Sequence, residues 1–381
     1  MAKYKLGDIC EIVSGSTPKT GVDEYWDGDI KWITPAELND DTYIITDSVR
    51  KITELAVKKT GLSPFPEGTV ILSSRAPIGK VAIAGCEMYC NQGFKNLICS
   101  DIINNRYLYW FLKGNTKYLN SIGRGATFKE ISKSIVSEIE INVPDLNEQA
   151  VAVANLEKIS KIIALRRQEL SALDELIKAR FVEMFGDVQH EEKYKGIQLR
   201  ELCTTMSGGT PSTKFPEYYK GDIPWISTVS LGPNHIDGTT AKGFITQEAI
   251  DNSATKLIPA GNILFGTRVG VGKSSLNDVD ICTNQDIVAI IGIDEKRFNR
   301  LFIKHVLDAY QPYYDSIKKG ATILGITGDD LKDTLIPNAP IEVQMEFEAF
   351  VEQVDKSKVA VKNALDHTKL LFDSLMQQYF G

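Results

Sequence analysis

The feature that most constrains this chain is that its sequence contains the same unit twice. With a shift of 193 residues, Leu6–Ile33 aligns with Leu199–Ile226 without a gap, and 14 of these 28 positions are identical. The same shift aligns three shorter motifs, namely Arg75 with Arg268, Gly79-Lys80 with Gly272-Lys273, and Asn91-Gln92 with Asn284-Gln285. A shift of 195 residues aligns Gly125–Thr127 with Gly320–Thr322 and Phe185-Gly186 with Phe380-Gly381. Chance does not keep one offset over so many motifs, so the 381-residue chain is a tandem duplication.

The first part of each copy has the pattern of a mixed α and β domain. Short apolar runs rich in Val, Ile, Tyr and Phe alternate with Gly, Pro, Asn and Asp, which is typical of strands joined by turns. Thr69–Leu72, Val81–Ala84 and Ile287–Ile291 are such runs. A helix is expected over Asn105–Tyr118, with its counterpart over Phe298–Tyr314.

The second part of each copy has the pattern of one long helix. Residues 147–185 contain no Gly or Pro, and mostly apolar residues recur with heptad spacing from Gln149 to Met184 and, 195 residues later, from Gln344 to Tyr379. Each helix should run about 37 residues, or roughly 55 Å. We expect the two helices to pack antiparallel as a coiled-coil rod, with the two globular domains near its ends and related by a pseudo-twofold axis. The alternative is that each helix folds back onto its own domain.

The predicted fold class is therefore α+β, with two globular domains joined by two long antiparallel helices. The expected boundaries place the first domain at residues 1–143, a central helical region at 144–190, the second domain at 191–339 and a C-terminal helical region at 340–381.

Charge indicates where ligands of different kinds would bind. The chain carries 43 basic and 50 acidic side chains, a net charge of −7, which excludes a uniformly basic nucleic-acid coat but not a local basic groove. The two globular domains are close to neutral, whereas the helical regions have an acidic excess. Because acidic helices repel phosphate, we expect nucleic acid on the globular domains and protein partners on the helices.

Composition also bears on the compartment. The N-terminus, Met1–Asp8, lacks the apolar core of a signal peptide, and no apolar run is long enough to cross a membrane. The six cysteines contain no C-x-x-C pair, which argues against a cysteine-rich zinc site. The expectation is a cytoplasmic protein with reduced thiols.

Signatures of catalysis are missing from the sequence. The four histidines (His190, His235, His305 and His367) do not have the spacing of metal ligands. The segment Gly266–Ser274 resembles a phosphate-binding P-loop, but the glycine required five residues before Gly272-Lys273 is Thr267. We therefore expect no catalytic residue, no metal site and no cofactor bound by this chain.

Both copies instead carry, at matched positions, side chains suited to DNA. Arginine and lysine can contact guanine edges or phosphates, Asn and Gln can pair with adenine, and Gly-rich loops expose backbone N–H groups to phosphates. The candidate DNA-binding residues are Arg75, Lys80, Asn91, Gln92, Arg124, Thr127 and Lys129 in the first copy and Arg268, Lys273, Asn284, Gln285, Lys318, Lys319 and Thr322 in the second. The alternative is that they are ordinary turn residues. Ser14–Pro18, Trp32 and their repeats are interpreted mainly as fold-forming.

Taken in order and twice, these motifs resemble the specificity subunit of type I restriction-modification systems over the whole chain. The family's recognition domains open with Ser-Gly-x-Thr-Pro and Gly-Asp-Ile-x-Trp-Ile, which appear here at Ser14–Pro18 and Gly28–Ile33 and again in the second copy. The Arg-x-x-[Ile/Val]-Gly, Asn-Gln and Gly-[Ser/Ala]-Thr motifs follow in both copies, and each long helix ends in Phe-Gly. One departure is Asp286, which replaces the Gly93 that follows Asn-Gln in the first copy, so contacts expected there are less secure.

The resemblance implies a non-catalytic, DNA-binding subunit. Each target recognition domain would read one half of a bipartite site in double-stranded DNA. Two modification subunits, which bind S-adenosylmethionine and methylate adenine N6, would dock on the helices, and restriction subunits that hydrolyse ATP would join them. Two alternatives stay open: the specificity module of another restriction-modification type, and a scaffold or decoy that binds methyltransferase subunits without reading DNA.

Overall fold

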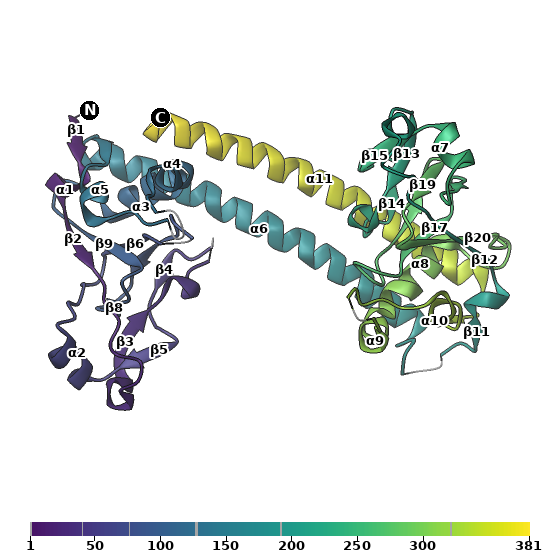
Figure 1. Cartoon of the computed structure of the whole chain (residues 1–381), viewed down its shortest axis with the longest axis horizontal. Helices are drawn as coiled ribbons and strands as arrows, with labels where there is room; N and C mark the ends of the chain where they lie inside the picture. Colours follow the sequence, from purple (N-terminus) through teal and green to yellow (C-terminus); the bar gives the residue numbers. More distant parts are fainter. Residues whose placement is uncertain (1, 40, 76, 126–128, 191–192, 321) are drawn as a thin grey trace. The chain divides into compact units, whose positions relative to one another are not determined.

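A computed structural model describes residues 2–39, 41–75, 77–125, 129–190, 193–320 and 322–381. The chain divides into two compact units (Figure 1), unit 1 with Met1–Gln168 and Lys362–Gly381, and unit 2 with Glu169–Val361. The two long helices are α6 (Leu146–Phe185) and α11 (Ile341–Phe380), each of 40 residues. Each unit therefore contains one globular domain together with parts of both long helices.

Unit 1 is built on a five-stranded sheet. The order of its strands is β2 (Cys10–Ser14), β9 (Phe94–Cys99), β6 (Val70–Ser73), β7 (Val81–Ala84), β4 (Ile44–Ile45). Its smaller sheets are β5 (Arg50–Ile52), β3 (Trp26–Ile33), β8 (Tyr89–Cys90) and the pair β1 (Ala2–Lys5), β10 (Glu140–Val143). Its short helices are α1 (Leu6–Ile9), α2 (Glu54–Thr60), α3 (Asn105–Gly114), α4 (Thr116–Ile122) and α5 (Lys133–Ser137).

Unit 2 repeats this arrangement. Its five-stranded sheet has the order β12 (Thr204–Ser207), β20 (Ile287–Ile291), β17 (Ile263–Gly266), β18 (Ser274–Asn277), β14 (His235–Ile236). Its other strands are β15 (Gly243–Ile245), β13 (Ile223–Ile226), β19 (Ile281–Thr283) and β16 (Leu257–Ile258), with the pair β11 (Gly196–Gln198), β21 (Leu335–Pro337). Its short helices are α7 (Gln247–Asp251), α8 (Arg300–Ala309), α9 (Gln311–Ile317) and α10 (Gly328–Lys332).

The matching strand orders confirm that the duplication is structural. Strands β2, β9, β6, β7 and β4 correspond in sequence and in position to β12, β20, β17, β18 and β14. In both units the strand that carries the Gly-Asp-Ile-x-Trp-Ile motif pairs parallel with the strand before Asn-Gln. The expected α+β class and the long helices are confirmed.

The predicted mid-domain helix is interrupted in both units. Helix α3 ends at Gly114 and α4 begins at Thr116, while α8 ends at Ala309 and α9 begins at Gln311. In unit 2 the break has a covalent cause, because Pro312 lacks the N–H of a helix interior and is tolerated only in a first turn. The continuous helices expected over Asn105–Tyr118 and Phe298–Tyr314 are therefore wrong in this detail.

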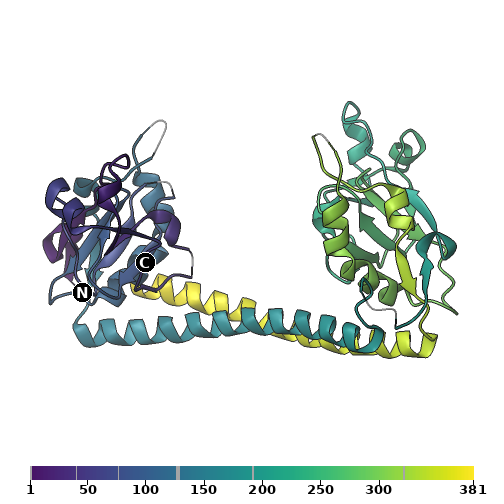
Figure 2. The same cartoon turned by 90° about the horizontal axis from the view of Figure 1, so that it is seen from below.

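Within each unit the two long helices run antiparallel. In unit 1 the start of α6 lies beside the end of α11 (Figures 1 and 2), and Asn155 Nδ2 donates to Tyr379 Oη at 2.9 Å. In unit 2 the end of α6 lies beside the start of α11, with Arg180 bonded to Glu346 at 2.8 Å and Phe181 packed edge-on against Phe347. The predicted antiparallel pairing is thus present in both units.

The helices also pack on the globular domains, as the alternative interpretation held. Ala152 and Leu156 of α6 belong to the core of unit 1 together with Leu108 of α3. Ile177 of α6 and Val351 of α11 belong to the core of unit 2. All positions of the predicted heptad series are buried or half-buried, which confirms the register. Pairing with the other long helix and packing on a globular domain were alternatives in the sequence analysis, and the helices do both.

The first heptad residue of each helix is a buried glutamine that ties the helix to its domain. Gln149 Nε2 donates to the carbonyls of Ile102 (3.0 Å) and Pro144 (2.9 Å), and its Oε1 accepts from the N–H of Asn104 at 2.7 Å. Gln344 makes the same three kinds of bond in unit 2. Both side chains are fully buried, so these glutamines satisfy backbone groups at the start of α3 and α8.

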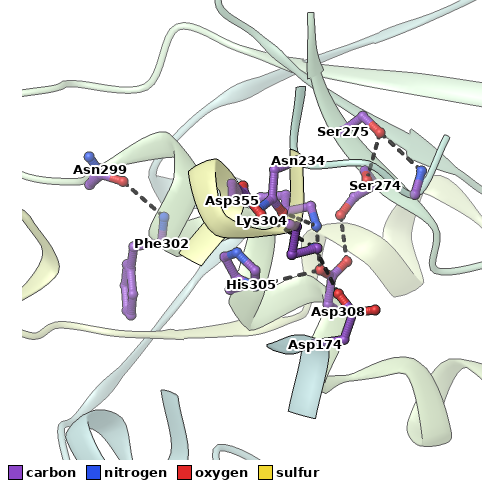
Figure 3. A network of polar contacts seen from close by, with 12 residues as sticks. Asp174, Asn234, Ser274, Ser275, Asn299, Phe302, Lys304, His305, Asp308 and Asp355 are labelled. Carbon is purple, nitrogen blue, oxygen red and sulfur yellow. Dashed lines mark hydrogen bonds and ion pairs between the residues drawn. The ribbon is translucent and has the colours of Figure 1, made fainter. Parts of the chain in front are cut away.

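A buried lysine joins α8 to the helical part of unit 2 (Figure 3). The ammonium of Lys304 donates to Asn234 Oδ1 at 2.8 Å and to Asp308 Oδ2 at 2.7 Å. Asn234 in turn donates to Asp355 of α11 at 2.7 Å, and Ser274 of β18 donates to the second oxygen of Asp308 at 2.7 Å. Only 4% of the Lys304 side chain is exposed, so its charge depends on these partners.

The same network continues to α6 through Lys358. This lysine pairs with Asp174 of α6 at 2.7 Å and with Asp355 at 3.3 Å. His305 lies near Asp308 in the same network (Figure 3), and its ring packs edge-on against Phe347. Burial, followed by the charges of Lys304 and Lys358, holds the pKa of His305 well below its usual value. The imidazole is therefore neutral in the folded protein at neutral pH.

Candidate nucleic-acid interface

The repeated Ser-Gly-x-Thr-Pro and Trp motifs form the support beneath the candidate interface. Trp32 is 2% exposed and donates from Nε1 to the carbonyl of Ser16 at 3.0 Å, and Trp225 donates likewise to Gly209 at 3.0 Å. A Cβ at Gly15 would lie 2.0 Å from the carbonyl oxygen of Asn91, so only glycine allows this close approach. These motifs are fold-forming, and they hold the Asn-Gln turn in place.

The Asn-Gln turns have the same internal bonding in both units. In unit 1 the Thr17 hydroxyl donates to Gln92 Oε1, and Asn91 Oδ1 accepts from the N–H of Gly93 at 2.9 Å. In unit 2 the Thr210 hydroxyl donates to Gln285 Oε1 at 2.5 Å. Both glutamines are exposed, whereas the asparagines are half-buried and act largely as turn caps.

Arg75 lies beside a hairpin in unit 1. The backbones of Arg124 and Glu130 pair in both directions at 2.9 Å, and Ile131 N–H donates to the carbonyl of Ser74, the residue before Arg75. This bonding joins the Gly-Ala-Thr loop to the arginine strand end. Arg124 and Lys129 are exposed on the hairpin, and Thr127 lies outside the described residues.

The arginine itself is held by an acidic residue that sequence reasoning did not select. Arg75 Nε donates to Glu130 Oε2 at 2.9 Å, and the other oxygen of Glu130 lies 3.3 Å from the ammonium of Lys95. Burial pushes the pKa of Glu130 upward, but the hydrogen bonds and charges of Arg75 and Lys95 outweigh it and keep this pKa below its ordinary value. Glu130 is therefore ionised at neutral pH.

Arg268 occupies the equivalent place in unit 2. The backbone of Lys319 pairs with Gly325, and Ile326 N–H donates to the carbonyl of Thr267 at 2.9 Å. Arg268 faces Asp286 with 3.9 Å between Nη1 and Oδ1. A hollow of about 390 Å³ is lined by Arg268, Lys319, Thr322 and neighbouring hairpin residues. The departure at Asp286 thus brings a carboxylate to the arginine instead of removing a contact.

The remaining candidate residues differ in how far their polar groups already bond within the protein. Lys80 donates from Nζ to the carbonyls of Pro35 (3.1 Å) and Leu38, which makes it the candidate most engaged within its own domain. Lys318 pairs with Asp315. Lys273, Lys319 and Thr322 are exposed. The structure thus gathers Arg75 with Arg124 and Lys129, and Arg268 with Lys319 and Thr322, around a hairpin in each unit.

In each unit the hairpin lies on the side of the domain away from the long helices. Figure 2 shows the described stretches on either side of residues 126–128 and 321 projecting from the sheets, while α6 and α11 cover the other side of the same unit. A ligand at the hairpins would therefore leave the helical surfaces of that unit open to a protein.

The helices expose apolar side chains that no domain covers. Large apolar residues that are 46–67% exposed on α6 and α11 are Leu146, Val151, Leu165, Leu176, Val182, Met345, Val359, Leu370 and Leu371. A hollow of about 1090 Å³ in unit 1 lies between α6, the end of α11 and aromatic residues such as Trp110. Exposed apolar surface of this kind is typical of protein interfaces.

The described part of the chain contains no cluster of three or more His, Cys, Asp or Glu side chains that could hold a metal ion. Its helices include none long and apolar enough to span a membrane.

The fold defines a protein with two duplicated α+β domains joined to long helices, and the family comparison identifies its class. The model of the type I restriction modification DNA specificity domain matches residues 1–175 and again residues 191–367. The chain therefore belongs to the specificity-subunit family of type I restriction-modification systems.

Individual relatives support this placement over most of the chain. The MjaIX specificity subunit of Methanocaldococcus jannaschii is 29% identical, with 98% of this chain and 90% of that protein aligned. The EcoR124I/EcoR124II specificity subunit of Escherichia coli is 27% identical over 59% of this chain and 57% of its own length. Among solved structures, the S subunit from M. genitalium has a TM-score of 0.57 at 14% identity, covering 100% of this chain and 96% of that one. A chain from a type I R-M assembly has a TM-score of 0.65 at 18% identity, covering 99% and 97%. These two structural likenesses show the fold.

Proposed function

We propose that this specificity subunit reads a bipartite site in double-stranded DNA, one half-site by each target recognition domain. The observation that carries the proposal is the repeated placement of an exposed arginine, Arg75 and again Arg268, beside a hairpin whose described strands pair at Arg124 with Glu130 and at Lys319 with Gly325. Two structurally matched readers on one chain suit a site with two halves, and arginine is the side chain most often used for guanine edges.

We further propose that the long helices bind two modification subunits and that restriction subunits join the complex. The exposed apolar side chains of α6 and α11 support this role. S-adenosylmethionine and ATP would then be bound by the partner subunits, and this chain would contribute recognition without catalysis of its own. Its place of action would be the cytoplasm, where the DNA substrate is.

The experiment that tests DNA reading compares methylated positions in the genome of the source cell with and without this gene. Deletion should abolish one bipartite methylation motif. In cells that carry Arg75→Ala or Arg268→Ala, each variant should degrade a different half of that motif. The Glu54→Gln variant, which breaks only an exposed ion pair with Lys58 in unit 1, serves as the control.

The competing function is a scaffold that binds methyltransferase subunits without reading DNA. It predicts assembly with those subunits but no salt-dependent binding of a specific duplex. A complex that binds all duplexes equally, or none, would favour the scaffold.

A further inference from the structure

Each of the two reading arginines faces a carboxylate, but the two carboxylates come from different positions. Arg75 pairs with Glu130 of the hairpin, whereas Arg268 pairs with Asp286 of the Asn-Gln turn. In the sequence repeat the counterpart of Glu130 is Gly325, and the counterpart of Asp286 is Gly93. The two copies have therefore kept an acidic partner for the arginine while changing the residue that supplies it.

The ion pair of Arg75 and Glu130 in unit 1 is fixed by further contacts. Glu130 Oε1 is fixed by Lys95, whose side chain is only 8% exposed and which also donates to Ser74 Oγ at 3.3 Å. Glu130 Oε2 accepts a hydrogen bond from Arg75 Nε at 2.9 Å. Because the guanidinium is a planar fork, fixing Nε fixes the direction of Nη1 and Nη2. Within the described ranges these two nitrogens have no partner, and 44% of the Arg75 side chain is exposed.

An ionised carboxylate next to the arginine argues against a phosphate as its ligand. A phosphate would meet the negative charge of Glu130 together with the positive charge of Arg75, which weakens the attraction. The edge of a base is neutral, so it meets no such repulsion. Two parallel N–H donors at the end of the fork match the O6 and N7 acceptors of guanine.

We propose, on the basis of the proposed DNA-reading function, that Arg75 reads the guanine of a G·C pair with its two Nη groups and that Glu130 is the positioning residue. Asp286 has the same role for Arg268. The distance from Asp286 Oδ1 to Arg268 is longer, at 3.9 Å, and is measured to Nη1 instead of Nε. Asp286 therefore fixes the guanidinium of Arg268 less firmly than Glu130 fixes that of Arg75.

The test selects duplexes from a random double-stranded library with the full-length chain, alone and together with its modification subunits, and sequences those that bind. Glu130→Gln and Arg75→Lys should each reduce the preference for guanine at the same single position of one half-site, by roughly 5- to 150-fold. The rest of that half-site and the whole of the other should be unchanged. Asp286→Asn should act on the other half-site, with a smaller effect.

Arg75→Lys, one double variant and the control Glu54→Gln distinguish the possible outcomes. Arg75→Lys keeps the charge and lies on the surface, so it tests the fork even if Glu130→Gln disturbs Lys95. The double variant Glu130→Gln/Lys95→Met removes the unpaired buried ammonium and should show the same loss of guanine preference with a restored melting temperature. Glu54→Gln should leave the motif unchanged. An equal loss of binding to all sequences would identify Arg75 as a phosphate contact, and an unchanged motif in Glu130→Gln would end the positioning role. If the unaltered chain selects no motif in either form, the proposed function itself is wrong.

Discussion

The buried ammonium of Lys304 is expected to be a main source of stability in unit 2. Replacement by Met keeps the length and apolar stem of the side chain but removes the charge and its bonds to Asn234 and Asp308. Losing one partner of a buried ion pair costs about 3–5 kcal/mol. Here the side chain of Asp308 is 35% exposed and keeps the hydroxyl of Ser274, so its carboxylate stays partly solvated. We therefore expect Lys304→Met to lower the free energy of unfolding of unit 2 by about 2–3 kcal/mol.

The measurement is hydrogen exchange of the full chain in low urea, read from peptides that cover α8 in unit 2 and α3 in unit 1. Protection of α8 should fall, and protection of α3 should not. The double variant Lys304→Met/Asp308→Asn should be less destabilised than the sum of the two single variants, because it leaves neither charge without its partner.

Lys332→Met is the matched control, since Lys332 and Asp329 form an exposed pair three residues apart in the same unit. It should change stability by less than about 0.5 kcal/mol. If Lys304→Met costs no more than this control, or affects α3 as much as α8, the network does not stabilise unit 2 as reasoned.

Three other perturbations follow from the same contacts. Gln149→Leu should destabilise the α3 region by roughly 1–3 kcal/mol and Gln344→Leu the α8 region, because each leaves three partly buried backbone groups without their partner. Hydrogen-exchange protection that falls in both units alike would contradict the assignment. The folded protein should lose stability as pH falls below about 6.5, because His305 takes up a proton in the unfolded chain but stays neutral when buried. His305→Phe should make this loss smaller. Urea unfolding at several pH values tests the prediction, with the exposed His367→Gln as control. Leu173→Asp should weaken binding of modification subunits, since it places a carboxylate against the core of unit 2 at a cost of several kcal/mol, and normal assembly of the purified variant would refute it.

The fold was largely predictable because a duplication supplies its own internal comparison. Strands β7 and β20 begin and end at the residues expected from apolar runs, and the heptad series identified the buried faces of α6 and α11. The sequence could not decide between helix pairing and packing on a domain, because the same apolar stripe satisfies both at different points along its length. In unit 2 the break was signalled by Pro312 inside the expected helix, whereas Asn115, at which the helix of unit 1 breaks, has no strong helix-breaking character of its own.

The candidate interface was predictable only where the two copies agree. The shared residues Arg75 and Arg268 were selected because they align, and the structure places both beside hairpins. Glu130, Lys95 and Asp286 were missed as partners because each faces a different residue type in the other copy: Gly325, Val288 and Gly93. A search for identical residues in the two copies cannot find a contact that a different position supplies in each copy. A search for acidic residues near each arginine would have found both carboxylates.

This difference indicates how a duplicated reader can diverge without losing its fold. Trp32 and Trp225, like Gln149 and Gln344, bond backbone groups whose positions define the domain, so a change in either copy would leave these groups without a partner. A side chain at Gly15 or Gly208 would collide with the backbone of the Asn-Gln turn. The carboxylate beside each arginine lies near an exposed edge and has one further partner, Lys95 for Glu130 and Asn284 for Asp286, and more than one loop comes close enough to supply it. Moving it from the hairpin to the Asn-Gln turn alters which edge of the arginine is held, and therefore the direction in which its free nitrogens point. Under the proposed function, two copies of one fold would in this way present the same arginine at different angles to two different half-sites.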